Sequence, residues 1–253
     1  MNNILIIGLG LIGGSIAKSL HTNNHELNDA VRGANHQVFS NLTNAETTPT
    51  NHLNAFNSDG FTLGNDGSVN TNSSNYCSWN WKANGQGSSN TDGTIDSTYT
   101  SANTTSGFSI ITYTGTGSAG TVGHGLGTTP SMVWIFNRTD GGNGHVFHKA
   151  LGSTQYLLHA SALGVQTYAP VGIGSLTSST FSVGTVGGVN GSSKNYVAYV
   201  FAEKNYYFHY YLDNQHHQNL FLQLHSHTFL ICLMMLIVCC HILKQYDTKQ
   251  KYL

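Results

Sequence analysis

Three glycines near the start of the sequence point most clearly to a specific chemical role. Gly8, Gly10 and Gly13 follow the apolar run Ile4-Leu5-Ile6-Ile7 and precede a helix-like stretch from Ser15 to Leu20. In this G-x-G-x-x-G spacing the first glycine allows a tight turn, the second lets the backbone approach a pyrophosphate, and the third lets helix and strand pack closely. Taken alone, the pattern predicts a dinucleotide-binding turn.

The residues that should complete such a site do not follow the usual pattern. A dinucleotide site needs a second apolar strand that ends in an acidic residue, about 20 residues past the glycines. Glu26 and Asp29 are acidic, but no apolar run precedes them. We therefore expect the first segment to have no partner strand and its glycines to be a remnant that binds no cofactor. A signal peptide is disfavoured, because no Lys or Arg precedes the apolar run.

Two further patterns could in principle do chemistry. The stretch from Asn90 to Asp96, with Asp92 between them, has the oxygen spacing of a small calcium loop but lacks the bidentate Glu, so we interpret it as a hairpin turn. His124 lies between two glycines, and no nucleophile or orienting carboxylate accompanies it at motif level, so we interpret it as a turn histidine.

The remaining histidines and the cysteines form no ordered ligand set. His145, His148 and His159 lie in strand-like sequence and are interpreted as surface or cross-strand residues. The other candidate ligands are scattered, and Cys77 lies alone in the β region. The C-terminal tail contains six histidines and three cysteines: His209, His216, His217, His225, His227, His241, Cys232, Cys239 and Cys240. Because zinc sites use fixed Cys and His spacings, we predict no metal site, and we predict no catalytic residue.

The composition and the spacing of turn residues indicate which structural elements surround these residues. Charged residues make up 8% of the 253 positions and the formal net charge is −1, which argues against a nucleic-acid partner. Short apolar and aromatic runs alternate with Asn-Gly, Asp-Gly, Ser-Gly and Gly-Gly pairs, which favour tight hairpins. We therefore predict an all-β fold, an antiparallel β-sandwich of concanavalin or jelly-roll type.

An internal repeat lies within this β region. The segment 61–81 matches 181–201 at a constant offset of 120 residues, without a gap. In its second strand, Trp79 and Tyr199 should point to the same face as Trp81 and Phe201, since strand side chains alternate. We predict that these aromatics are core rather than a sugar-stacking platform, and that their neighbours Ser78 and Ala198 are exposed.

The sequence divides into three segments. Residues 1–30 form a truncated Rossmann-like start, 31–203 the β region with its repeat units, and 204–253 a divergent tail. Within the tail, residues 229–243 are almost wholly apolar but shorter than the roughly 20 residues that a membrane-spanning helix needs. Membrane contact by this segment is left open.

Two families resemble parts of the chain. Residues 1–20, with the run GLGLIGGSIAKSL, resemble the start of prephenate dehydrogenases, which implies NAD for an enzyme of that family. Residues 35–203 look like a domain of unknown function from tail and other structural proteins of marine bacteriophages. Seven motifs in the same order carry this second resemblance: DGFTLG, YxxWxWKA, TDGTI, ANTTSGFSI, GHGLG, VFHKALG and YVAYVFAE.

The second resemblance implies a virion-associated protein, often with a concanavalin-like sandwich beside the domain. After Glu203 the chain departs from the family's usual strand, and the dehydrogenase-like start replaces the upstream sandwich, which suggests a chimeric reading frame. We predict a non-enzymatic virion module that contacts other virion proteins or a host-surface glycan, with a homo-oligomer left open. An NAD-binding dehydrogenase fragment and a membrane-anchored surface protein are the alternatives.

Overall fold

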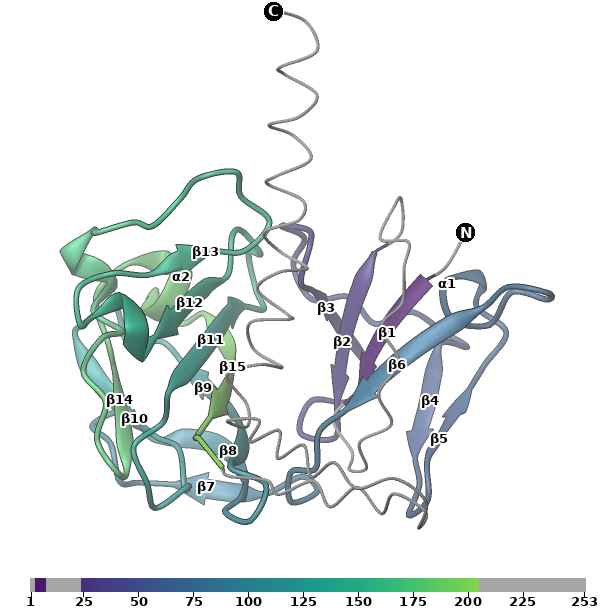
Figure 1. Ribbon diagram of the computed structural model, residues 1–253, viewed down its shortest axis with the longest axis horizontal. Helices are drawn as coiled ribbons and strands as arrows, with labels where there is room; N and C mark the ends of the chain where they lie inside the picture. The colour runs from purple at the N-terminus through teal and green to yellow at the C-terminus, as the bar shows by residue number, and fades with distance from the viewer. Residues whose placement is uncertain (1–2, 8–23, 205–253) are drawn as a thin grey trace, which may run out of the picture. The chain divides into compact units, whose positions relative to one another are not determined.

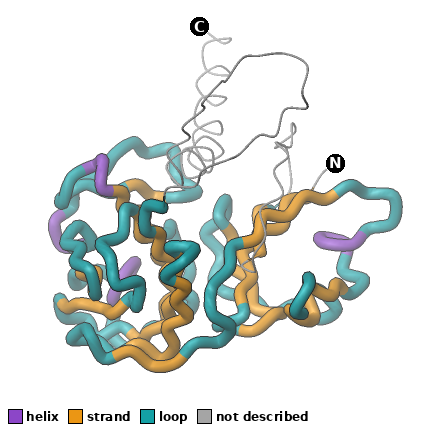
Figure 2. The backbone as a smooth tube through the Cα atoms, turned by 60° about the horizontal axis from the view of Figure 1, so that its bottom comes forward, coloured by secondary structure: helices purple, strands orange, loops and turns teal. Residues whose placement is uncertain are grey.

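The computed structural model describes residues 3–7 and 24–204, and these residues form an almost entirely β structure (Figure 1). Within these residues, helical structure is limited to single turns, as Figure 2 shows. The strands are β1 (Asn3–Ile7), β2 (His25–Asp29), β3 (Gly33–Phe39), β4 (Leu53–Phe56), β5 (Phe61–Leu63), β6 (Tyr76–Asn80), β7 (Ser88–Asn90), β8 (Ser97–Asn103), β9 (Phe108–Thr114), β10 (Gly120–Gly123), β11 (Met132–Asn137), β12 (His145–His148), β13 (Leu157–Leu158), β14 (Thr180–Val183) and β15 (Asn195–Phe201). The short helices are α1 (Gly67–Asn70), η1 (Lys149–Leu151), η2 (Ala169–Val171) and α2 (Gly187–Asn190).

A seven-stranded antiparallel sheet, in the order β13-β12-β11-β15-β9-β8-β7, carries most of the core. Its central strand β15 pairs with β9 on one side and with β11 on the other. One face of the sheet packs against the two-stranded sheet β10-β14, which gives the two β layers of a sandwich. The prediction of an all-β sandwich is confirmed.

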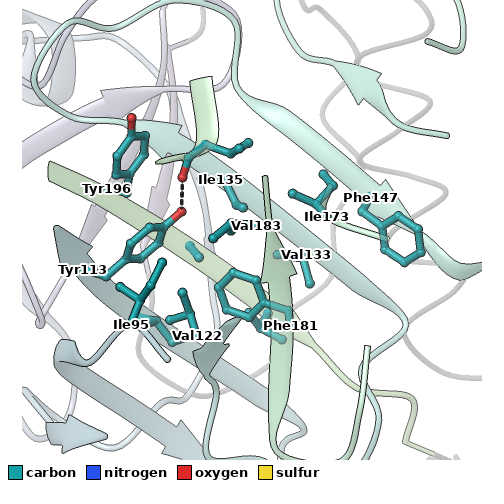
Figure 3. Packing of buried hydrophobic residues seen from close by; sticks show 14 of the residues in the cluster. Ile95, Tyr113, Val122, Val133, Ile135, Phe147, Ile173, Phe181, Val183 and Tyr196 are labelled. Carbon is teal, nitrogen blue, oxygen red and sulfur yellow. Dashed lines mark hydrogen bonds between the residues drawn. The ribbon is translucent and has the colours of Figure 1, made fainter. Parts of the chain in front are cut away.

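The space between these two layers is filled with aliphatic and aromatic side chains (Figure 3). From β15 come Tyr196, Ala198 and Val200, and from β14 come Phe181 and Val183. The Tyr113 hydroxyl is also buried here and donates a hydrogen bond to the Val189 carbonyl at 2.6 Å. A buried hydroxyl with a partner avoids the free-energy cost that an unpaired one would carry.

The opposite face of the seven-stranded sheet is aromatic. Tyr199 and Phe201 on β15 lie beside Phe108 on β9, whose ring stacks on that of Tyr199 at an interplanar angle of 4°. Trp81, just after β6, has its ring 6.3 Å from those of both Phe108 and Phe201. These contacts join the first repeat unit to the sheet that contains the second.

Both faces of β15 are therefore buried, which corrects one prediction. Ala198 was expected to be exposed, but its exposed fraction is 0% because it points into the sandwich core. Tyr199 and Phe201 are buried on the other face, so for these two rings the core interpretation is confirmed. A strand at the centre of a sheet that is covered on both faces has no side that faces solvent. Its sequence therefore does not alternate between apolar and polar residues, and the exposed positions cannot be predicted from such an alternation.

The N-terminal strands form a separate four-stranded sheet in the order β3-β2-β1-β6. β1 pairs in parallel with β2 and with β6. We expected no partner for the first strand, and this expectation was wrong. Strands pair through their backbone N–H and C=O groups, so a polar strand such as His25–Asp29 can pair with β1. Its buried carboxylates must in turn be hydrogen-bonded by other side chains.

The repeat seen in the sequence is also a repeat of structure. The order β5-α1-β6 in the first unit matches β14-α2-β15 in the second. Three hydrogen bonds recur at the same offset. The Tyr76 hydroxyl donates to the Gly67 carbonyl and accepts from Thr71 N, and the Tyr196 hydroxyl likewise donates to the Gly187 carbonyl and accepts from Gly191 N. Asn70 Nδ2 donates to the Gly64 carbonyl, as Asn190 Nδ2 does to the Gly184 carbonyl. Ser73 and Ser193 both adopt positive φ, 61° and 59°. The two segments therefore share one local backbone design.

The surroundings of the two units differ. β15 is central in its sheet, whereas β6 is at the margin of the four-stranded sheet among the described strands. Trp79 is half-buried, unlike its counterpart Tyr199. The same local design thus supports a buried strand in one unit and a marginal one in the other.

The chain separates into two compact units, Met1–Ala202 and Glu203–Leu253. The apolar segment 229–243 and the tail histidines lie outside the described residues. Within residues 3–7 and 24–204, no helix has the length and apolar character required to cross a membrane.

The repeat offers a matched pair of substitutions. Asn190 is fully buried, and its side chain also accepts from Thr116 N and donates to the Ser118 carbonyl. Asn190→Ala should therefore lower the free energy of unfolding by about 2 kcal/mol or more, because several buried groups lose their partner. Asn70→Ala removes one exposed bond and should cost about 1 kcal/mol or less. Equal losses in urea unfolding would show that the local motif, and not its burial, sets the cost.

Candidate functional site

The glycines of the dinucleotide pattern lie outside the described residues, but the strands that flank them are described. β1 ends at Ile7, directly before Gly8, and β2 lies parallel to it and ends at Asp29. Asp29 therefore occupies the position at which a dinucleotide fold places its ribose-binding acid.

The carboxylate of Asp29 is already bound by the protein. Its Oδ1 accepts from the backbone N–H groups of Val31 and Arg32, at 3.0 and 2.8 Å. Its Oδ2 accepts from Arg32 Nε at 2.5 Å and from the Tyr199 hydroxyl at 2.8 Å. The residue is 0% exposed. A carboxylate with four internal donors and no solvent contact is not available to a ribose.

Arg32 is the centre of this buried cluster. Its guanidinium contacts Asp29, the Leu27 carbonyl, the Tyr199 hydroxyl at 2.9 Å and Glu46 Oε2 at 2.9 Å. Burial on its own would lower the pKa of Arg32, but the neighbouring charges, Asp29 foremost, hold that pKa above its ordinary value. Arg32 therefore stays charged in the interior, where it is compensated by two carboxylates.

Glu46 connects the cluster to Arg138, which follows β11. Arg138, just after β11, donates to both of its oxygens at 2.8 and 2.7 Å, and His36 Nδ1 lies 3.0 Å from Oε1. Burial would raise the pKa of Glu46, but the hydrogen bond from Arg138 and the charge of Arg32 lower it from 4.5 to about 2. We call Asp29, Arg32, Glu46, Arg138 and Tyr199 the ionic joint. It ties β2 and β3 to β11 and β15.

The sequence analysis missed the ionic joint, although a signal for it exists. The chain contains only two arginines, Arg32 and Arg138, and both contact Glu46. Arginine forms bidentate pairs with carboxylates and is the usual choice for buried ion pairs. Because the chain has so few charged residues, its two arginines are candidates for partners of carboxylates in the interior.

The two loop motifs follow the ends of strands β7 and β10. Asn90 Oδ1 accepts from Asp92 N at 2.9 Å, and Asn90 Nδ2 donates to Asp92 Oδ2 at 3.0 Å, which is an Asx turn. His124 is 0% exposed: its Nδ1 accepts from Leu126 N at 3.1 Å and its Nε2 lies 3.3 Å from the Thr177 carbonyl. The turn interpretation is confirmed for the stretch from Asn90 to Asp96, whereas His124 lies in the loop directly after β10. Within the described residues, no group of three or more His, Cys, Asp or Glu could hold a metal ion.

His145, His148 and His159 were interpreted as surface or cross-strand residues. All three are buried, so the surface alternative is wrong, and the cross-strand alternative holds for His145 and His148. His145 and His148 are cross-strand residues of β12, opposite Ile135 and Met132. His159 is 1% exposed, and the Trp134 indole donates to its Nδ1 at 3.0 Å. Burial lowers the pKa of both His145 and His159 from 6.5 to about 4. Strand pairing placed these rings inside, where the neutral form is favoured.

The exposed apolar side chains lie elsewhere, in one loop. Within the described chain, the large hydrophobic residues with high exposure are Leu163 (55%), Val165 (46%) and Tyr168 (60%). They belong to residues 160–168, which we call the apolar loop. Its base is held by a pair of backbone hydrogen bonds between Tyr156 and Gln166, at 3.0 and 2.8 Å. The loop is therefore an anchored projection from β13.

The ionic joint predicts a large and specific loss of stability. Arg32→Met leaves the carboxylate of Asp29 buried without its cation, and Glu46 keeps only Arg138, so the variant should lower the free energy of unfolding by about 3–5 kcal/mol. Lys194→Met, which removes the solvent-exposed pair with Asp140, is the control and should leave the urea midpoint unchanged. A similar small effect for both would mean that the joint adds nothing to stability.

Stability should also depend on pH in two separate windows. Because His145 and His159 stay neutral in the folded chain down to about pH 4, the unfolded chain binds more protons between pH 6.5 and about 4, and stability falls as the pH falls through that range. Glu46 is ionised in the folded state to about pH 2, so its contribution is lost only between pH 4.5 and about 2. His159→Gln should flatten the upper window, and Glu46→Gln only the lower. Urea unfolding at a series of pH values measures both slopes, and an unchanged upper slope in His159→Gln would contradict the assignment.

Comparison with known proteins places the chain in one family. No curated protein and no solved structure matches it. A family model described as a domain of unknown function, DUF7483, matches residues 16–223. The match leaves out Gly8, Gly10 and Gly13 and includes the ionic joint, the repeat and the apolar loop. The chain belongs to the DUF7483 family of domains of unknown function.

Proposed function

We propose that this chain is a non-enzymatic structural or receptor-facing module of a virion, with other virion proteins or a host-surface glycan as its partners. The observation that carries the proposal is the distribution of polar and apolar side chains. Charged side chains contact one another in the interior, namely Asp29, Arg32 and Glu46, whereas large apolar side chains are exposed in one loop. A rigid scaffold that presents an apolar loop is the usual design of a binding module.

The phage origin rests on the seven ordered motifs of the sequence, and the fold is compatible with it. GHGLG forms the loop after β10, VFHKALG spans most of β12 and all of η1, and YVAYVFAE spans most of the central strand β15. The motifs therefore belong to turns and core strands. In such a protein the scaffold is fixed by packing, and partner choice belongs to the loops.

A dinucleotide-binding fragment is the second candidate, favoured by one observation. The parallel pairing of β1 with β2 on either side of the glycine pattern is the strand arrangement of a dinucleotide fold. The contacts of Asp29 count against it, because Arg32 and Tyr199 take the carboxylate that a ribose would need. We therefore rank this candidate below the virion module.

Particle composition tests the virion proposal. Virus particles purified on a density gradient from the culture that carries this gene should contain peptides of residues 24–204, in constant ratio to a capsid protein across the gradient. Peptides found only in the soluble fraction would reject the proposal.

Calorimetric titration of NAD into the full chain separates the second candidate. The virion proposal expects no heat of binding. Micromolar binding that is abolished by Gly10→Asp would favour the dinucleotide fragment instead.

A further inference from the structure

The same dipeptide occurs in three different environments of this chain. Asn-Gly pairs lie at positions 84–85, 143–144 and 190–191. The glycine of such a pair has no Cβ and rotates freely, so its backbone nitrogen can approach the side-chain carbon Cγ of the asparagine. Attack at that carbon displaces the side-chain nitrogen as ammonia. Whether a pair can react therefore depends on whether the fold holds these two nitrogens in place.

The pair at 190–191 is held at both nitrogens. Asn190 is 0% exposed, and its Nδ2 donates to the carbonyls of Ser118 and Gly184 at 2.6 and 2.9 Å. The backbone nitrogen of Gly191 donates to the Tyr196 hydroxyl at 2.6 Å. The attacking nitrogen and the leaving nitrogen both have partners, so this pair can react only after the fold opens around it.

The pair at 143–144 is held at the attacking nitrogen. Gly144 N donates to His159 Nε2 at 3.2 Å. A Cβ built on Gly144 would lie 2.0 Å from the His159 ring carbon Cε1, so the ring covers this glycine closely. The side-chain oxygen of Asn143 is itself buried. The Gly144 nitrogen therefore cannot swing toward the asparagine while His159 is in place.

The pair at 84–85 is open. Asn84 and Gly85 are both exposed. Within the described part of the chain, neither the side-chain amide of Asn84 nor the Gly85 N–H has a hydrogen-bond partner. A Cβ built on Gly85 meets no atom within 4 Å, so the space around the glycine is empty of protein. Nothing in the fold opposes the rotation that brings the Gly85 nitrogen to Asn84 Cγ.

We propose that Asn84 is a site of spontaneous modification, at which the chain forms a succinimide with Gly85 and then opens to aspartate or isoaspartate. The Gly85 nitrogen loses its proton to hydroxide and bonds to Asn84 Cγ, while the Cγ–Nδ2 bond breaks and ammonia leaves with a proton from water. A water molecule then opens the ring at one of its two carbonyls. The net change replaces an amide with a carboxylate and consumes only water. It requires neither the virion role nor the apolar loop.

The modification would also release a backbone contact. Ser101 on β8 is 0% exposed, and its Oγ accepts from Asn84 N at 2.8 Å and donates to the Gly85 carbonyl at 2.7 Å. Isoaspartate routes the main chain through the side chain of residue 84, which adds one bond of about 1.5 Å between these two groups. Because hydrogen bonds weaken steeply when distance and angle change, Ser101 can then hold only one of them. The segment between β6 and β7 is thereby loosened from β8.

The three pairs allow a test within one molecule. The full chain is kept folded at mildly alkaline pH, and peptide mass spectrometry follows the conversion of Asn84, Asn143 and Asn190, with isoaspartyl methyltransferase as the label for isoaspartate. Since Asn143 and Asn190 react only after local opening, Asn84 should convert at least about tenfold faster than either. In concentrated urea the three should convert at similar rates, because no fold then restrains them.

Two results would overturn the assignment of Asn84. One is an equal rate at the three sites in the folded chain, or no conversion at Asn84. The other is a lead of Asn84 that persists in urea, because the neighbouring residues rather than the fold would then select the site.

Hydrogen exchange tests the release from Ser101. The amide of residue 84 should exchange faster in the aged chain than in the fresh one. It should stay slow in aged Asn84→Gln, whose longer side chain does not readily close the ring. Freshly prepared Asn84→Asp is the matched control, because it adds the charge without lengthening the main chain and should keep this amide protected. Unchanged exchange in chains that contain isoaspartate would show that Ser101 still holds both groups and would overturn the release.

Discussion

The fold of residues 24–202 depends on one buried cation. Arg32 lies between Asp29 and Glu46 and also contacts Tyr199, so a single guanidinium connects the N-terminal sheet with the central strand of the seven-stranded sheet. A buried charge is costly unless every partner is in place. This requirement fixes where β2, β3 and β15 lie relative to one another more narrowly than apolar packing alone would. Hydrophobic contact tolerates sliding, whereas the four directed hydrogen bonds of the Arg32 side chain do not.

The duplicated units show how one local design serves two environments. The tyrosine and asparagine contacts that stabilise the turn between the strands are the same at Tyr76 and Tyr196, and at Asn70 and Asn190. Around them the neighbours differ: the second unit is enclosed by β9 and β11, and the first is not. The local motif therefore sets the turn, and the surrounding strands decide whether its aromatic residues become core.

Sequence reasoning succeeded where the pattern is local and failed where partners come from far away. The hairpins, the turn at Asn90 and Asp92 and the repeat all follow from neighbouring residues. The burial of Ala198 and of His159 does not, because it depends on layers contributed by distant segments. The pairing of β1 with β2 was missed because the second strand is polar, and its buried carboxylates find distant partners: Arg32 and Tyr199 for Asp29, and His52 at 2.6 Å for Glu26. Tertiary partners of this kind leave no periodic signal.

The position of β15 has a consequence for synthesis on the ribosome. This strand separates β9 from β11 in the sheet, yet it is the last described strand along the chain. Until residues 195–201 emerge from the exit tunnel, β9 and β11 each lack the neighbour that completes their hydrogen bonding, and Ile111 and Val133 lack the side chains that cover them. Closure of the sheet is thus a late event with long-range pairing, which folds slowly. During translation the nascent chain exposes two apolar strand edges, and it depends on chaperones or on rapid completion to avoid pairing with its neighbours on the same message.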